Sequence, residues 1–139
     1  MKQKRQFGFT MIELLVVLVI LGLLAGLVGP QFFGKVDSSK VRTAETQVKM
    51  FKMALQTYRL DMGAYPGSLN DLNTAPAKEK TYWDGPYLGE KLPQDPWNNK
   101  YEYRLDSKAA QGFYLYSLGA DGAEGGEALN ADIGYVPRV

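Results

Sequence analysis

Four carboxylates lie close together near the end of the chain, on a segment that is rich in glycine. They are Asp121, Glu124, Glu127 and Asp132. Carboxylate and carbonyl oxygens are the hard ligands that calcium prefers, and glycine lets a backbone wrap closely around an ion. The segment does not match the EF-hand pattern. The residues alone therefore leave two interpretations open, a cation-binding loop and a solvated acidic turn.

Other chemistries are excluded or poorly supported. The sequence has no cysteine and no histidine, which rules out disulfides, thiol nucleophiles, zinc sites built on these residues and histidine-dependent triads. Asp95, Asp121 and Asp132 could be imagined as the carboxylates of a secreted hydrolase, but no nucleophile and base are spaced to support this. We expect a protein that is not an enzyme. Because 16 Lys+Arg balance 15 Asp+Glu, bulk charge gives no argument for a nucleic-acid partner.

A second group of residues with chemical potential lies at the start of the chain. Lys2, Lys4 and Arg5 precede a run, residues 14–28, that is entirely apolar or glycine. With its neighbours this run approaches the ~20 residues that cross a bilayer core. Length alone also allows a secretory signal peptide. Glu13 is the one charge at the edge of the run, where a carboxylate is costly unless it is paired or reaches the headgroup region.

A long helix follows from the apolar pattern. A core stripe recurs at alternating spacings of three and four residues, which places it on one helix face; it comprises Val41, Ala44, Val48, Phe51, Leu55, Tyr58 and Met62. Asp37 to Ser39 either cap a second helix or lie on one continuous helix that begins near Thr10. We expect Pro30 and Gly34 to kink or loosen a continuous helix, and Gly63 to end it.

The rest of the chain indicates a small sheet. Residues 68–89 read as irregular, with a short helix at residues 69–72. Two strands are predicted at residues 101–105 and 113–118, and a short stretch at 133–136 closes the chain. We expect the fold class α+β: one long N-terminal helix packs its second half on a small antiparallel β-sheet, followed by a C-terminal calcium-type loop, meaning one whose residues suit that ion. The first half of the helix is expected to span a membrane.

The N-terminal residues resemble the type III signal of type IV pilins and pseudopilins. That signal has a basic leader, a glycine before the cut, phenylalanine after it and glutamate as the fifth mature residue; here Gly8, Phe9 and Glu13 match. The resemblance implies that a membrane prepilin peptidase cuts after Gly8 and methylates the new amine of Phe9. Glu13 would then pair with that amine in a neighbouring subunit. The implied organisation is a leader at 1–8, a transmembrane and assembly segment at 9–30, and a periplasmic domain at 31–139.

Three later stretches resemble the major pseudopilin of bacterial type II secretion systems. They are Gly85–Leu88, Leu92–Tyr103 and Ser117–Gly134 with its acidic glycine-rich core. Asn98 stands where this family usually has glycine, and asparagine tolerates a left-handed backbone well. Family members bind one calcium ion in the last loop. The resemblance therefore implies calcium held by the Asp121 and Asp132 side chains and the Leu118 carbonyl, with Asn130 as a weaker candidate.

The function that the resemblance implies is structural. The chain would polymerise into a homo-oligomeric helical filament, the periplasmic pseudopilus that drives type II protein secretion. Its partners would be other pseudopilins, the inner-membrane assembly platform and the prepilin peptidase. It would cross the bacterial inner membrane once, with its C-terminal domain in the periplasm. A type IV pilus major pilin and a minor pseudopilin are the alternatives.

Overall fold

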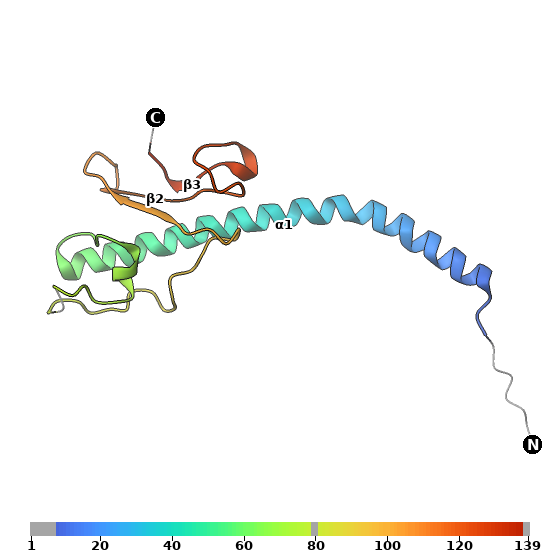
Figure 1. Cartoon of the computed structure of the whole chain (residues 1–139), viewed down its shortest axis with the longest axis horizontal. Helices are drawn as coiled ribbons and strands as arrows, with labels where there is room; N and C mark the ends of the chain where they lie inside the picture. Colours follow the sequence, from blue (N-terminus) through green and yellow to red (C-terminus); the bar gives the residue numbers. More distant parts are fainter. Residues whose placement is uncertain (1–7, 79–80, 138–139) are drawn as a thin grey trace, which may run out of the picture. The chain divides into compact units, whose positions relative to one another are not determined.

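The computed structural model describes residues 8–78 and 81–137, and the side chains of all of these except residues 31–33. Lys2, Lys4 and Arg5 of the predicted leader lie outside the described residues. The described chain forms two compact units that divide after Asp37. One helix, α1 (Met11–Met62), contributes to both (Figure 1). The predicted boundary at residue 30 stays a prediction.

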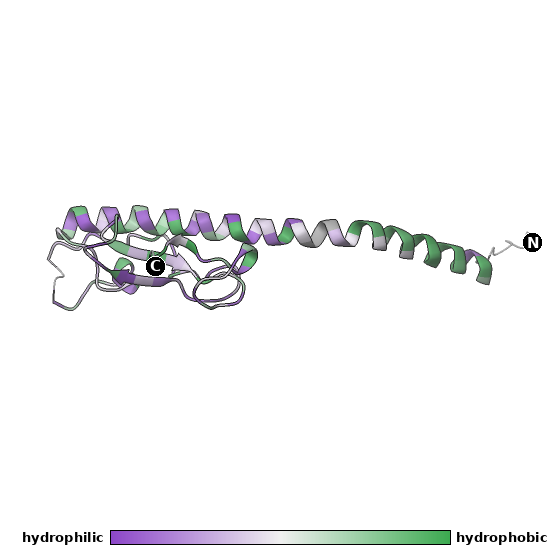
Figure 2. Cartoon of the chain, turned by 90° about the horizontal axis from the view of Figure 1, so that it is seen from above, coloured by the Kyte–Doolittle hydropathy of each residue, from purple (hydrophilic) through white to green (hydrophobic). Residues whose placement is uncertain are grey.

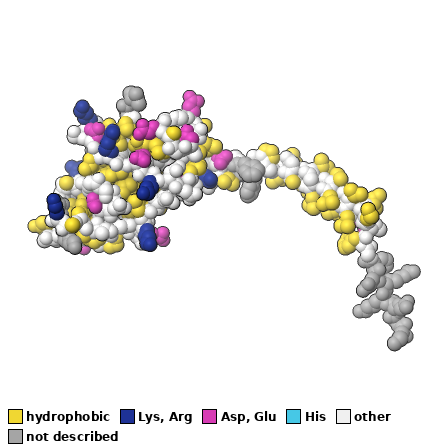
Figure 3. Space-filling model, viewed as in Figure 1, with side chains coloured by type: hydrophobic (Ala, Val, Ile, Leu, Met, Phe, Trp, Pro, Cys, Tyr) yellow, Lys and Arg dark blue, Asp and Glu magenta, His cyan; other side chains and the backbone are white. Residues whose placement is uncertain are grey.

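The first unit holds the apolar half of α1, and no other element of the described chain covers it. Residues 14–28 are all exposed, and the next residue, Gly29, is partly covered. The most apolar 18 consecutive residues of α1 are not buried by any other described residue. By length and composition, the helix could span a membrane. Figure 2 shows hydrophobic residues around this part of the helix, and Figure 3 shows hydrophobic side chains covering its visible face. Pro30 lies inside α1, so the helix is continuous there and a separate second helix at Asp37 is not formed.

The second unit has its own hydrophobic core. The core stripe faces it, because Ala44, Val48, Phe51, Leu55 and Tyr58 are all buried. Figure 2 shows the matching alternation of hydrophobic and hydrophilic residues along this half of α1. The helix ends where the sequence indicates: Gly63 has φ +79 and its N–H donates to the Arg59 carbonyl at 2.8 Å, a left-handed C-terminal cap.

A three-stranded antiparallel sheet packs on this half of the helix, in the order β1-β2-β3 (Figure 1). Strand β1 (Glu102–Leu105) pairs with β2 (Phe113–Ser117), and β2 pairs with β3 (Ile133–Tyr135). Phe113 and Leu115 of β2 are fully buried. The two predicted strands are confirmed with slightly shorter bounds, and the closing stretch forms the third strand of the same sheet.

Two short 3₁₀ helices complete the unit, η1 (Leu69–Leu72) and η2 (Ala128–Asn130). The predicted short helix at 69–72 is therefore present in the tighter 3₁₀ form. The predicted left-handed turn is confirmed at Asn98, whose φ is +66. Between β2 and β3 lies a segment, residues 118–132, which we call the C-terminal loop.

Candidate functional site

The start of α1 carries the first group of predicted site residues. Gly8, Phe9 and Thr10 precede the helix without regular secondary structure, and all three are exposed. The Phe9 side chain is 84% exposed. A Cβ built on Gly8 would meet nothing within 4 Å among the residues that the structure describes. Both residues that flank the bond between Gly8 and Phe9 are thus exposed, and no packing within residues 8–78 and 81–137 requires glycine at position 8.

Glu13 has a structural role that the sequence interpretation overlooked. Its carboxylate accepts hydrogen bonds from the Thr10 backbone N–H at 3.0 Å and from the Thr10 hydroxyl at 3.2 Å. In return, the Glu13 backbone N–H donates to the Thr10 hydroxyl oxygen at 3.3 Å. This is a capping box, which satisfies two of the N–H groups left open at a helix start. The signal was visible as threonine followed three residues later by glutamate.

The outward face of α1 in the second unit carries an uncharged strip that we call the outer stripe. Its members are exposed and spaced four and three residues apart: Ser39, Thr43, Thr46, Met50, Met53, Thr57 and Leu60. Met53 is 68% exposed and Leu60 84% exposed. The hydroxyls of Thr43, Thr46 and Thr57 donate to backbone carbonyls one turn earlier at 2.8–3.1 Å. Their polar groups are therefore satisfied within the helix.

The C-terminal loop is closed at its neck, where its two ends meet. The Ala120 N–H donates to the Leu129 carbonyl at 2.9 Å. A Cβ on Gly119 would lie 2.8 Å from the Ala131 carbonyl oxygen, and one on Gly126 would lie 2.4 Å from that of Asn130. Both glycines have positive φ values. Only glycine leaves space for these carbonyls at such close approach.

The predicted calcium ligands fall on this loop in different environments. Asp132 is half-buried; its Oδ2 accepts the Gly125 N–H at 2.9 Å, while its Oδ1 is buried with no hydrogen-bond partner among the described residues. Asp121 is exposed and its Oδ1 accepts the Ala123 N–H at 3.1 Å. Asn130 is exposed and contributes its backbone to η2. A buried carboxylate oxygen without a donor is costly, and a bound cation would satisfy it.

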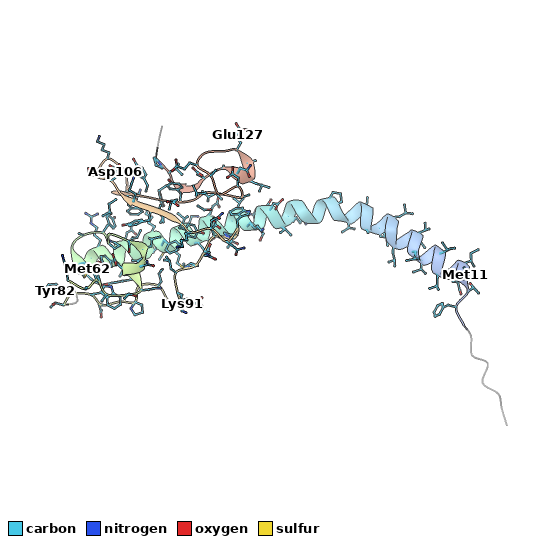
Figure 4. All side chains as sticks on the ribbon, viewed as in Figure 1. Met11, Met62, Tyr82, Lys91, Asp106 and Glu127 are labelled. Carbon is cyan, nitrogen blue, oxygen red and sulfur yellow. The ribbon has the colours of Figure 1, made fainter. Side chains whose placement is uncertain are left out.

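The other two acids of the loop are used differently. The Glu124 carboxylate accepts a hydrogen bond from the Tyr116 hydroxyl at 3.3 Å. Burial, followed by the charge of Glu124, raises the pKa of Tyr116. Glu127 is exposed, and Figure 4 shows its side chain pointing away from the loop. No group of three or more carboxylates is gathered for a metal within the part of the chain that the structure describes, so a cation here would depend on backbone carbonyls as well.

Sequence reasoning missed Asp95 as a structural residue of this region. It is 3% exposed. Its Oδ1 accepts the N–H groups of Trp97 at 3.0 Å and Asn99 at 2.8 Å, and its Oδ2 accepts the Ser117 hydroxyl at 2.6 Å. Asp95 therefore joins the turn at residues 95–99 to the end of β2. Its position rules it out as an accessible catalytic carboxylate.

Comparison with known protein families assigns nearly the whole described chain. Residues 31–136 match the family described as Type II secretion system (T2SS), protein G, and residues 3–29 match the prokaryotic N-terminal methylation motif. The chain belongs to the type II secretion system protein G family. Members of this family are structural subunits of the pseudopilus in type II secretion, which agrees with the expected non-enzymatic role.

Individual relatives align with nearly the full length of the chain. The type II secretion system core protein G of Pseudomonas aeruginosa is 44% identical, over 96% of this chain and 97% of its own length. That of Vibrio cholerae is 40% identical, over 96% and 93%. In structure, the chain is similar to the major pseudopilin of the type 2 secretion system of enterohaemorrhagic Escherichia coli. The TM-score is 0.58 at 27% identity, covering 73% of this chain and 90% of the other. The methylation motif and the apolar helix indicate a membrane-anchored pseudopilin.

Proposed function

We propose that the processed chain polymerises into a homo-oligomeric helical filament, the pseudopilus that drives type II secretion, together with other pseudopilins and an inner-membrane assembly platform. The observation that carries this proposal is the exposed apolar half of α1, which nothing in the described chain covers. Such a surface requires lipid or other protein around it. Before assembly, membrane lipid surrounds the apolar half of α1. In the filament, the helices of neighbouring subunits take the place of the lipid.

Processing by the prepilin peptidase is the first step of this proposal. The peptidase cuts between Gly8 and Phe9 and methylates the new Phe9 amine. The exposure of both residues and the lack of regular structure around the bond support this site. The space beside Gly8 among the described residues is consistent with a glycine that serves recognition by the peptidase.

Glu13 then acts in assembly. The capping box orients its carboxylate toward the helix start, only four residues after Phe9. After cleavage, the cationic amine of a neighbouring subunit supplies the opposite charge that a carboxylate at a membrane edge needs. The cap and the intermolecular pair are separate roles of the same side chain, and they can be separated by mutation.

The outer stripe extends the proposed contact surface. Its occupant is a second copy of this chain, because the stripe lies on the same helix as the exposed apolar half. Methionine and leucine supply apolar contact area, and the internally bonded threonines leave no hydroxyl to be desolvated unpaired. An uncharged strip of this kind suits helix-to-helix packing between subunits.

The orientation follows from charge. Lys2, Lys4 and Arg5 precede the apolar run, and basic residues stay on the cytoplasmic side. The second unit then lies in the periplasm. Because the chain has no cysteine, a Ser107→Cys variant in the exposed turn after β1 carries a unique thiol. An impermeant maleimide should label it in spheroplasts; labelling only after permeabilisation would contradict this orientation.

Calcium binding by the C-terminal loop is also part of the proposal. The residues fit the ion: Asp132 offers a buried oxygen without a donor, Asp121 offers a second carboxylate, and Leu118 offers a carbonyl at the neck, with Asn130 as a weaker candidate. Calcium accepts such a mixture of carboxylate and carbonyl oxygens. When bound, the ion would offset the repulsion between the acids of the loop.

The experiment that tests the function directly uses protein from membranes of the native host. Intact mass and N-terminal sequencing should give a chain that starts at methylated Phe9, and sedimentation after mild solubilisation should give filaments of this chain. A chain that starts near Ala25 or Gly29 would mean that the apolar helix is a discarded signal peptide. Correctly processed chains that never sediment as filaments would contradict polymerisation.

A further inference from the structure

The turn at residues 95–99 packs against the C-terminal loop and the end of β2. Asp95 is buried, and its Oδ2 accepts a hydrogen bond from the Ser117 hydroxyl, with 2.6 Å between the two oxygens. Since that hydrogen points to the carboxylate, the lone pairs of the Ser117 oxygen face away from it and accept the Gly119 N–H at 3.1 Å. Ser117 is itself fully buried. The chain of bonds thus runs from Asp95 through Ser117 to the first glycine of the loop.

The hydrogen bond from the Gly119 N–H to the Ser117 hydroxyl oxygen also sets the direction of the Leu118 carbonyl. The Gly119 N–H and the Leu118 C=O belong to one planar trans peptide unit, in which the two groups point in opposite directions. Fixing the N–H on the Ser117 hydroxyl oxygen therefore fixes the direction of the Leu118 carbonyl. That carbonyl is the backbone oxygen proposed as a calcium ligand.

A second contact joins the same turn to the loop. A Cβ on Gly122 would lie 3.5–3.7 Å from the side-chain amide of Asn99, so the amide lies against the loop backbone. The Asn99 backbone also exchanges hydrogen bonds with Asp95, because its N–H donates to Oδ1 and its carbonyl accepts the Asp95 N–H at 2.9 Å. The left-handed Asn98 closes the turn between them. The turn is thus held by its own hydrogen bonds; it contacts the loop directly through Asn99 and is linked to Gly119 through Ser117.

We infer that Asp95 and Ser117 are positioning residues that aim the Leu118 carbonyl toward the cation site. This inference rests on the proposed calcium binding. The direction of the Leu118 carbonyl is fixed before calcium binds, because the hydrogen bonds from Ser117 to Asp95 and from Gly119 to Ser117 are made within the protein. Pre-orientation of a ligand lowers the entropy lost on binding, and supporting hydrogen bonds of this kind typically change metal affinity 10–100-fold.

The test is calcium titration of the full chain in detergent by calorimetry, joined to amide hydrogen exchange in chelator. Ser117→Ala removes the acceptor of the Gly119 N–H but leaves the hydrogen bonds that the Trp97 and Asn99 N–H groups donate to Asp95. It should weaken calcium binding by about tenfold or more and speed exchange at Gly119. If the alanine variant does not fold, Ser117→Cys replaces it, because cysteine has a similar volume. Its sulfur accepts hydrogen bonds only weakly, so it should change calcium affinity and exchange at Gly119 in the same direction.

Two further variants separate positioning from general stability. Asp95→Asn should retain most of the affinity, since an amide accepts from the turn through its oxygen and donates to Ser117 through its nitrogen. Tyr103→Phe removes a hydrogen bond from the neighbouring strand to Pro66, so it should lower stability without changing calcium affinity or exchange at Gly119. If Ser117→Ala binds calcium as tightly as the unchanged chain, the inference is wrong.

The exchange measurement keeps this inference distinct from the proposed calcium function. If the unchanged chain binds no calcium, the calcium proposal fails. Faster exchange at Gly119 in Ser117→Ala would still support a role of Ser117 in holding the Gly119 N–H. Unchanged exchange there would overturn the positioning role itself, whatever the metal does.

Discussion

Thr10 and Glu13 close the start of α1 by exchanging hydrogen bonds, each side chain accepting the backbone N–H of the other residue. Glu13 therefore has a function inside its own subunit, besides its proposed pairing with the Phe9 amine of a neighbour. A substitution that deletes the whole side chain, such as Glu13→Ala, removes both at once. Loss of secretion in that variant would not identify which role matters.

A pair of variants at these two positions separates charge from capping. Glu13→Gln removes the charge, but its amide oxygen can still accept the Thr10 N–H, because glutamine also serves in capping boxes. Thr10→Ala keeps the charge and loses the hydroxyl half of the cap, which destabilises a helix start by about 0.5–2 kcal/mol. We expect Glu13→Gln to be processed and membrane-bound but to fail in filament growth and secretion, while Thr10→Ala assembles. Sedimented filament and exported protein are the measured quantities.

The reverse result would give the opposite conclusion. If Glu13→Gln secretes at the level of the unchanged chain while Thr10→Ala does not, the carboxylate serves only as a helix cap. The intermolecular pair would then be discarded.

Gly8 offers a test of processing that is independent of folding. Because no described residue lies within 4 Å of a Cβ at this position, a bulky substitution such as Gly8→Leu should leave the folded domain unchanged. We expect an uncut precursor that accumulates in the inner membrane, measured by intact mass. Melting of the purified precursor should match that of the unchanged chain in the same detergent. Cleavage at the normal bond in Gly8→Leu would show that the peptidase does not require the glycine.

The outer stripe predicts an assembly defect without a folding defect. Met53 is 68% exposed, so Met53→Glu should not alter the core, yet it places a charge in an uncharged contact between copies. We expect filament yield to fall by about tenfold or more, because a charge buried without a partner is costly, while thermal unfolding stays unchanged. Gln56→Glu is the matched control, since Gln56 is exposed on the same helix but outside the stripe. Equal filament yields from the two variants would exclude the stripe as a contact.

The sequence predicted those features that depend on local pattern. The core stripe of α1 follows from its periodicity, since residues on one face of a helix recur every three or four positions. The left-handed turn at Asn98 was instead expected from the resemblance, because asparagine tolerates that backbone where the family usually has glycine, and its φ is positive. The Thr10–Glu13 cap was equally local and could have been recognised from its spacing.

Features that depend on tertiary contact could not be predicted in this way. The bond between Asp95 and Ser117 joins residues 22 positions apart, and no local pattern indicates which serine lies beside a buried aspartate. The exposed position of Asp121 and the half-buried position of Asp132 likewise depend on how the loop folds back at its neck. The continuity of α1 through Pro30 was left open, because a proline tolerated inside a helix and one that ends it look alike in sequence.

Alkaline pH should destabilise the second unit. Burial, followed by the charge of Asp95, raises the pKa of Tyr101 above its usual value near 10. Burial also raises the pKa of Tyr103. The folded form therefore holds these protons more tightly than the unfolded chain. Stability should be constant with pH up to about 10 and fall above it, as the unfolded tyrosines ionise first. Urea midpoints from pH 8 to 11 measure this.

A variant of Tyr101 makes the assignment specific. Tyr101→Phe loses the hydrogen bond to Gln47, so it should be less stable at neutral pH by about 1 kcal/mol. Its decline above pH 10 should nevertheless be shallower. Tyr82→Phe is the control, because that ring is 74% exposed, and its profile should match the unchanged chain. Identical slopes in Tyr101→Phe and the unchanged chain would contradict the assignment.

Calcium should stabilise the full chain in detergent, because the loop carries acids that repel one another and a buried Asp132 oxygen without a donor. An ion that binds only the folded form adds about 2.7 kcal/mol when it is a hundredfold above its dissociation constant. We expect the melting temperature to be several degrees lower in chelator than in calcium. Magnesium should rescue poorly, since it prefers a small octahedral shell with retained waters.

The matched variants are Asp121→Asn and Asp106→Asn. Both aspartates accept the N–H of the residue two positions later, Ala123 at 3.1 Å and Lys108 at 2.9 Å, so both substitutions disturb a similar turn. Only Asp121 belongs to the C-terminal loop. Asp121→Asn should therefore remove most of the difference between calcium and chelator, while Asp106→Asn should leave it intact. If the unchanged chain gives superimposable melting curves in calcium and in chelator, the loop is a solvated acidic turn, and the unpaired Asp132 oxygen needs another donor.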